Sequence, residues 1–164
     1  MNGGSDLKLL DRGLTFIEYV IGAFLFILMI SVCYDVAARG LFNSPTIWAN
    51  EISLYLLQAI ILLGMAVNLR HREHIQVTFL ITNLKPTAKK ILGVFHMLVV
   101  LAFAAVVIKY GYDYFAAALE TGRRSSTLLK IPLFIPYAIL PLSGVLLGLE
   151  AFRQMIVLWM KKEA

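Results

Sequence analysis

The residues best suited to chemistry in this chain are three histidines and a few charged side chains near the ends of apolar stretches. His71 and His74 flank Glu73 and could begin a metal site, but no further ligand follows nearby. We therefore interpret them as polar residues of a loop. His96 stands alone in an apolar stretch, whereas a bis-imidazole haem site would need a second histidine at the same depth. We expect a histidine that is hydrogen-bonded within the protein, and no cofactor.

No residues in the sequence form a catalytic set. The serines are scattered, no nucleophile elbow is present, and no glycine-rich loop could cradle a phosphate. We predict that the chain is not an enzyme. Cys33 is the only cysteine, so we expect it to be a small buried hydrophobic residue.

Ionisable residues at membrane depth are candidates for transport sites, but here they lie toward the ends of the apolar stretches. These end residues are Glu18, Asp35, Arg39, Glu51, Glu150 and Arg153. Only Gln58 and His96 lie near the middle. Transporters that act alone usually build a midplane site from broken helices in repeated halves, and no internal repeat is present. We interpret the chain as a membrane subunit that supports a partner.

Four long apolar stretches contain no Asp, Glu, Lys or Arg: Tyr19–Tyr34, Ile52–Leu69, Ile91–Ile108 and Ile131–Leu149. With its flanking residues each reaches the roughly 20 residues that a membrane-spanning helix needs. Hydrophobic residues make up 60% of the chain. We predict an all-α integral membrane four-helix bundle with tilted helices, forming a single domain over residues 1–164. The expected spans are about 14–42, 47–69, 88–110 and 131–158.

The connections follow from local signals. Between the second and third spans we expect a short interfacial helix, capped by Thr78 and ended before Pro86. The third helix should continue past its span to Gly122, with Lys109–Glu120 as an amphipathic, aromatic-rich arm at the outer face. Gly111 is a possible bend in this arm.

The last helix contains prolines and glycines at positions that affect its start, its straightness and its packing. Pro132 and Pro136 should lie in its first turns, and Pro141 should kink it. Gly144 and Gly148 form a small-xxx-small pair that permits close approach of another helix.

The positive charges indicate the orientation. Of the 15 Lys and Arg residues, ten lie at the two termini and in the middle loop, and five lie on the opposite side. The excess marks the cytoplasmic face, so both termini should be inside. The basic residues occupy helix ends, which is a topology signal, and we expect no nucleic-acid partner.

The first outer connection holds several polar and aromatic residues. Asp35 and Arg39 are spaced for a same-face ion pair. Residues 43–45 (NSP) should break the helix, and Trp48 should lie at headgroup level. Glu51 comes in the first turns of the next helix, where the helix dipole favours a carboxylate.

Three runs in order resemble the small membrane subunit of tripartite ATP-independent periplasmic (TRAP) transporters. Residues 39–51 (RGLFNSPTIWANE) resemble the family pattern of an Arg, then Phe-Asn-x-Pro, then Trp-x-x-Glu. Residues 72–80 (REHIQVTFL), which include His74 and Thr78, resemble its His-Ile-Arg-Val-Asp-Leu-Leu stretch. Residues 129–141 (LKIPLFIPYAILP) resemble its Leu-x-Ile-Pro-x-Trp-x-x-Tyr-x-x-x-Pro segment.

The resemblance implies a multi-pass protein of the bacterial inner membrane. In this family a periplasmic protein captures a carboxylate-bearing solute, such as a C4-dicarboxylate or sialic acid. A large membrane subunit moves the solute inward by an elevator motion driven by a sodium gradient. The small subunit binds no solute and enlarges the scaffold. The implied partners are the large subunit, the solute-binding protein and lipids.

Within that scheme, the resemblance suggests roles for single residues. Arg39 and Glu51 would pair to fix the first two helices. Arg123, Arg124 and Lys130 would face the periplasm and either dock the binding protein or contact lipid headgroups.

Two other functions remain open from the residues alone. A self-contained homo-oligomeric channel or exporter would transport by itself. A haem- or quinone-binding anchor of a redox complex would absorb visible light. The sequence specifies neither the solute nor whether the large subunit is a separate chain.

Overall fold

The computed structural model describes residues 3–44, 46–71, 86–127 and 129–160. They form four helices: α1 (Gly3–Phe42), α2 (Ile47–His71), α4 (Pro86–Thr121) and α5 (Phe134–Met160). The described residues hold no strand, only a single bridge between Arg124 and Pro132. Each helix contains a stretch long and apolar enough to cross a membrane. The predicted all-α fold with four spans is confirmed.

Local signals set the helix ends. Beyond α1, Asn43 takes a left-handed conformation with a φ of 48°. Gly122 follows α4 with a φ of 60°, and the Arg123 amide donates to the Ala118 carbonyl at 3.3 Å. Gly122 is therefore the C′ residue that the sequence predicted. Pro132 lies before the start of α5 instead of in its first turns, because Arg124 and Pro132 pair in the preceding loop.

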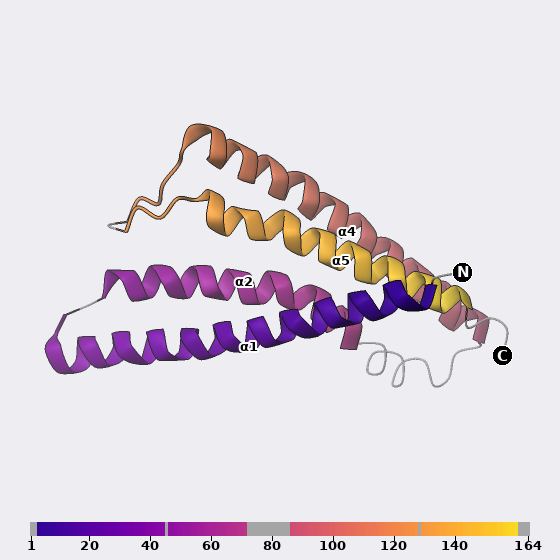
Figure 1. Cartoon of the computed structure of the whole chain (residues 1–164), viewed down its shortest axis with the longest axis horizontal. Helices are drawn as coiled ribbons and strands as arrows, with labels where there is room; N and C mark the ends of the chain where they lie inside the picture. Colours follow the sequence, from indigo (N-terminus) through magenta and orange to yellow (C-terminus); the bar gives the residue numbers. More distant parts are fainter. Residues whose placement is uncertain (1–2, 45, 72–85, 128, 161–164) are drawn as a thin grey trace.

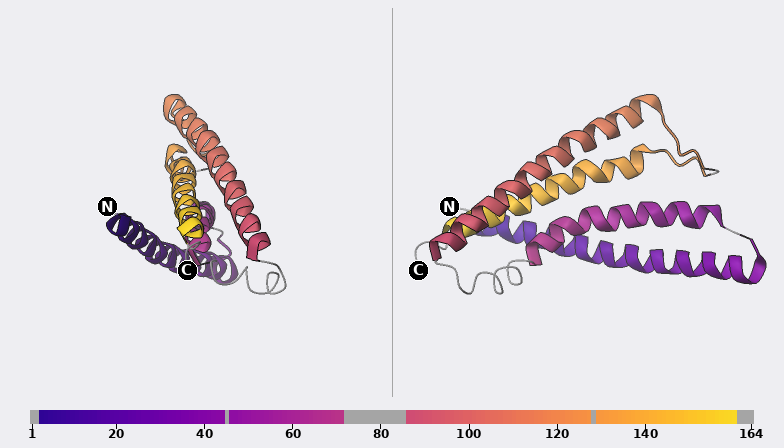
Figure 2. Two further views of the ribbon diagram at one scale, coloured as in Figure 1. Left: turned by 90° about the vertical axis from the view of Figure 1, so that its right-hand side faces the viewer. Right: turned by 180° about the vertical axis from the view of Figure 1, so that it is seen from behind.

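The helices form two hairpins, α1 with α2 and α4 with α5, which contact each other mainly through α2 and α5 (Figure 1). In Figure 2 the hairpins converge at the end that carries both chain termini and diverge toward the opposite end. We call these the terminal end and the far end. Both termini lie at the same end, as a chain with four spans requires.

Small residues allow α4 and α5 to pack closely. A Cβ atom added to Gly144 would lie 2.8 Å from Ile108 Cγ1, and one added to Gly148 would lie 3.6 Å from Ala104 Cβ. At Gly111 the added atom would lie 2.8 Å from the Cβ of Leu140. Gly111 is therefore a packing contact of α4 with α5, within the span of one helix. The Lys109–Glu120 arm forms the last turns of α4.

The outside of the chain is apolar on all four helices. Large hydrophobic side chains such as Phe26, Phe95 and Phe152 are exposed in the isolated chain. Cys33 is also exposed, so the prediction that it is buried within the chain is wrong. The physical reason is that α1 contacts its neighbours along only a narrow face, and most of its surface is left for lipid or a partner.

The expected interfacial helix, His74 and Thr78 lie outside the described residues.

Candidate functional site

The middle of the described bundle holds few polar contacts. Gln58 of α2 donates to the Pro136 carbonyl of α5 at 3.2 Å, which ties the two hairpins together. Ser53 and Ser31 approach within 3.3 Å between α2 and α1. The His96 side chain makes no hydrogen bond with the described residues, so the expected internal bond is not found there. Among all the residues that the structure describes, no group of three His, Cys, Asp or Glu side chains is close enough together to hold a metal ion.

The terminal end carries an ion-pair network between α1 and α5. Arg153 Nη1 lies 2.5 Å from Asp11 Oδ1, and Arg153 Nε lies 3.1 Å from Glu150 Oε2. Glu150 is fully buried, with 1% of its surface exposed. A buried carboxylate is costly unless a close cation or hydrogen-bond donors compensate for the lost water. Gln154 supplies such a donor at 3.1 Å from Glu150 Oε1.

The same network reaches α2. Arg70 lies 3.4 Å from Glu18 Oε1 and 3.6 Å from Asp11 Oδ1. His71 Nε2 lies 2.7 Å from Glu18 Oε1. Gln154 also donates to the Leu69 carbonyl at 2.7 Å. We call this set the terminal cluster: Asp11, Glu18, Arg70, His71, Glu150, Arg153 and Gln154.

Sequence reasoning missed the terminal cluster. It placed Glu18, Glu150 and Arg153 at span ends but did not join them to one another. A signal was available. The predicted spans place the acidic residues of α1 and α5 and the basic residues of α2 and α5 at the same end of the bundle, where they could pair.

At the far end, the predicted ion pair of Asp35 with Arg39 is present at 2.7 Å. Asp35 also accepts hydrogen bonds from the Thr46 backbone amide, at 3.1 Å, and from the Thr46 hydroxyl. The Tyr34 and Trp48 rings lie 5.4 Å apart between their centroids. These contacts fix the turn that joins α1 to α2.

Glu51 has different partners from those expected. Its carboxylate accepts hydrogen bonds from the Tyr55 hydroxyl, at 3.1 Å, and from the Thr127 hydroxyl. Because Arg39 pairs with Asp35 and Glu51 is satisfied by hydroxyls, the expected Arg39–Glu51 pair is not formed. The two residues instead line one recess.

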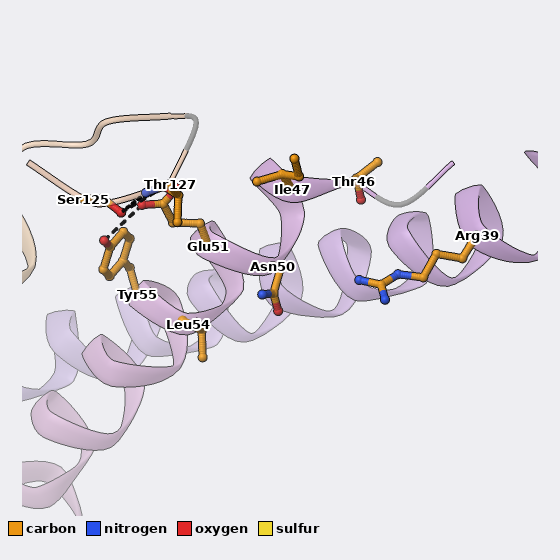
Figure 3. A pocket seen from close by; sticks show the side chains of 9 residues that line it. All are labelled: Arg39, Thr46, Ile47, Asn50, Glu51, Leu54, Tyr55, Ser125 and Thr127. Atoms are coloured by element: carbon orange, nitrogen blue, oxygen red, sulfur yellow. Dashed lines mark hydrogen bonds between the residues drawn. The ribbon is translucent and has the colours of Figure 1, made fainter. Parts of the chain in front are cut away.

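Figure 3 shows this recess, in which Tyr55, Glu51 and Thr127 gather at one side and Arg39 lies at the other. Its volume is about 330 Å³. The lining residues are Arg39, Thr46, Ile47, Asn50, Glu51, Leu54, Tyr55, Ser125 and Thr127. The hydroxyls of Tyr55 and Thr127 both donate to Glu51, so these contacts join α2 to the loop that follows α4 and suit bracing between the two segments.

The loop between α4 and α5 folds back on itself. The Ser125 amide donates to the Ile131 carbonyl at 2.8 Å, and the Leu133 amide donates to the Arg123 carbonyl at 3.0 Å. Arg123, Arg124 and Lys130, the predicted docking residues, are all exposed on this loop. The three basic residues therefore lie together on one exposed loop at the far end.

Comparison with known proteins identifies related chains. The family model described as "Tripartite ATP-independent periplasmic transporters, DctQ component" matches residues 28–161. The sialic acid TRAP transporter small permease protein SiaQ of Vibrio cholerae is 26% identical over 110 residues, which cover 66% of this chain. The chain thereby spans 64% of SiaQ.

Two further relatives differ in length. The C4-dicarboxylate TRAP transporter small permease protein DctQ of Vibrio cholerae is 24% identical over 166 residues, covering 87% of this chain and 69% of that protein. The sialic acid TRAP transporter permease protein SiaT of Haemophilus influenzae is 32% identical over 101 residues. That match covers 60% of this chain but 16% of SiaT, so SiaT is a much longer permease with one similar segment.

Proposed function

The chain belongs to the DctQ component family of tripartite ATP-independent periplasmic transporters, and from this premise we propose that it is the small permease subunit of such a transporter. It is a multi-pass membrane protein. The family match over residues 28–161 is the observation that carries the proposal.

We propose that the transporter takes up a solute bearing a carboxylate. The relatives are named for sialic acid and for C4-dicarboxylates, and both solute classes are carboxylates. In this proposal the solute is captured by a periplasmic binding protein and moved by a large membrane subunit in an elevator motion coupled to sodium.

The small subunit would act as a fixed scaffold for the large one. Its polar side chains support this role, because those of the terminal cluster and of Glu51 are occupied by partners inside the chain. Its apolar outer faces offer surface for a membrane partner and for lipid. The similar segment within the longer permease SiaT also favours a chain that works beside a large permease.

The orientation in this proposal places the terminal end in the cytoplasm and the far end in the periplasm, across the bacterial inner membrane. The Lys and Arg excess at the termini and middle loop supports it. Arg123, Arg124 and Lys130 would then be accessible to the binding protein. Reversing the charges of Arg123 and Arg124 should weaken docking, and normal docking and transport in that variant would remove the role.

Co-expression with a large TRAP permease and reconstitution into vesicles test the proposed function. We expect the chain to co-purify with the large subunit. Sodium-driven solute uptake should require the large subunit, this chain and the binding protein together. Vesicles holding this chain alone should show no uptake. Uptake by the chain alone would instead favour the homo-oligomeric channel or exporter.

A further inference from the structure

The loop between α4 and α5 reaches across the far end to the first turns of α2 (Figure 1). We infer that Glu51 and Thr127 form a latch that joins the two hairpins at the far end, with Glu51 as a positioning residue. This inference rests on contacts inside the chain and does not depend on the transport role.

The burial of Glu51 explains why the loop is held. Only 4% of its surface is exposed, and no Lys or Arg of the described residues lies within ion-pair distance. A buried carboxylate without a cation needs hydrogen-bond donors instead. Tyr55 lies one turn after Glu51 on α2, so its hydroxyl can donate to Glu51 whatever the position of the loop. Thr127 comes from the loop, so its donor is present only when the loop is docked.

Hydrogen bonds within the loop connect Thr127 to the adjoining helices α4 and α5. The Thr127 and Ser125 hydroxyls lie 2.9 Å apart, and the Ser125 amide bonds across the loop to Ile131. The Leu133 amide, immediately before α5, bonds to the Arg123 carbonyl. Fixing Thr127 on α2 therefore also fixes the start of α5 and the end of α4.

The latch adds to a second tie between the hairpins. Gln58, about two turns deeper in α2, donates to the Pro136 carbonyl in the first turn of α5. The hairpins diverge toward the far end (Figure 2), and there the Glu51–Thr127 contact joins the loop that follows α4 to α2. The latch also sets where Arg123, Arg124 and Lys130 are presented.

Spin-label distances on the full-length chain test the latch. With Cys33→Ser as background, labels at Ser44→Cys and Ser126→Cys report the spacing between the α1–α2 turn and the loop, because both positions are exposed. The unaltered latch should give one narrow distance distribution. Thr127→Val removes the hydroxyl at nearly constant shape and should broaden the distribution and lengthen its mean. Thr127→Ser keeps a hydroxyl and is the matched control.

Limited trypsin digestion gives a second readout at Arg123 and Arg124. Loss of a hydrogen bond to a carboxylate should raise cleavage there about tenfold in Thr127→Val relative to Thr127→Ser. Thr127→Ala should do the same and serves if the valine variant does not fold. If both hydroxyl-free variants match Thr127→Ser in distance and in cleavage, the latch is wrong.

Discussion

Glu150 shows at the residue scale how this bundle tolerates a buried charge. Its side chain is enclosed between Arg153, three positions later, and Gln154, four positions later. Arg153 in turn reaches Asp11 on α1. Arg153 therefore both pairs with the buried Glu150 carboxylate and joins α5 to α1, so it matters for packing as well as for charge.

Replacing Arg153 by Met should strongly destabilise the protein. The change breaks the ion pair that Arg153 makes with the buried Glu150 carboxylate, and breaking a buried pair costs about 3–5 kcal/mol. Thermal unfolding of the purified chain measures this loss. The double variant Glu150→Gln with Arg153→Met removes the stranded charge and should recover part of the stability. Equal losses in the single and double variants would show that the charge itself is not responsible.

Two glycines of the α4–α5 contact should respond very differently to alanine. At Gly111 the added Cβ would lie 2.8 Å from Leu140 Cβ and 2.9 Å from the Pro141 backbone nitrogen. Backbone atoms there cannot move aside cheaply, so Gly111→Ala should cost about 1–3 kcal/mol. At Gly148 the nearest atom, Ala104 Cβ, would be 3.6 Å away, which is ordinary contact. Gly148→Ala should therefore be neutral in the same unfolding measurement.

A comparable loss for both alanine variants would contradict the packing argument. It would mean that glycine is needed at these positions for backbone freedom and not for space.

At the scale of elements, the sequence predicted the helices well because their signals are local. Runs without charge define the spans, and Gly122 ends α4 where a left-handed residue was expected. Pro132 was misplaced because the Arg124–Pro132 bridge is a pairing between chain segments that composition does not encode. The contact of Gly111 with α5 could not be predicted from the sequence, because it depends on where α5 lies.

The candidate site was predicted less completely because its contacts are long-range. Asp35 and Arg39 are four residues apart on one helix, and their pair was predicted. Glu51 and Thr127 lie on different hairpins, and no periodicity relates them. The same holds for Asp11 and Arg153, which lie near opposite ends of the sequence. The Arg39–Glu51 pair that the resemblance suggested is not formed, because Arg39 pairs with Asp35 and hydroxyl groups satisfy Glu51.

The turn between α1 and α2 should depend on Asp35 more than on Arg39. Asp35 accepts from the backbone amide and hydroxyl of Thr46, the residue before α2, whereas Arg39 joins through a half-exposed ion pair. Exposed ion pairs contribute little to stability, and an unmet backbone donor costs more. In amide exchange, Asp35→Ala should speed exchange at Thr46 about tenfold. Arg39→Ala should change it little.

An equal effect of the two alanine variants on Thr46 would mean that Asp35 holds the turn only through its pairing with Arg39. Asp35→Asn keeps an acceptor for Thr46 and should lie between the wild type and Asp35→Ala.

At the scale of the whole molecule, the shape follows from long helices with few internal contacts. The 36 residues of α4 extend about 54 Å at 1.5 Å per residue, well beyond a hydrocarbon core of about 30 Å. The helix must tilt, project, or do both. Its exposed tyrosines, Tyr110, Tyr112 and Tyr114, lie in the turns nearest the far end, where an aromatic belt would meet the headgroups. We therefore expect the basic loop to lie beyond the lipid.

The two ends of the molecule should therefore be reachable from opposite sides of the membrane. With Cys33→Ser as background, a membrane-impermeant maleimide added to intact cells, with access to the periplasm, should label Ser126→Cys on the far-end loop. It should label Arg12→Cys near the terminal end only after lysis, because the Lys and Arg excess at that end predicts a cytoplasmic location. Both positions are exposed in the isolated chain, so burial would not explain a difference between them. The opposite labelling pattern would mean that the orientation is reversed. The terminal cluster would then face the periplasm, where the proposed binding protein approaches, and the basic loop would face the cytoplasm.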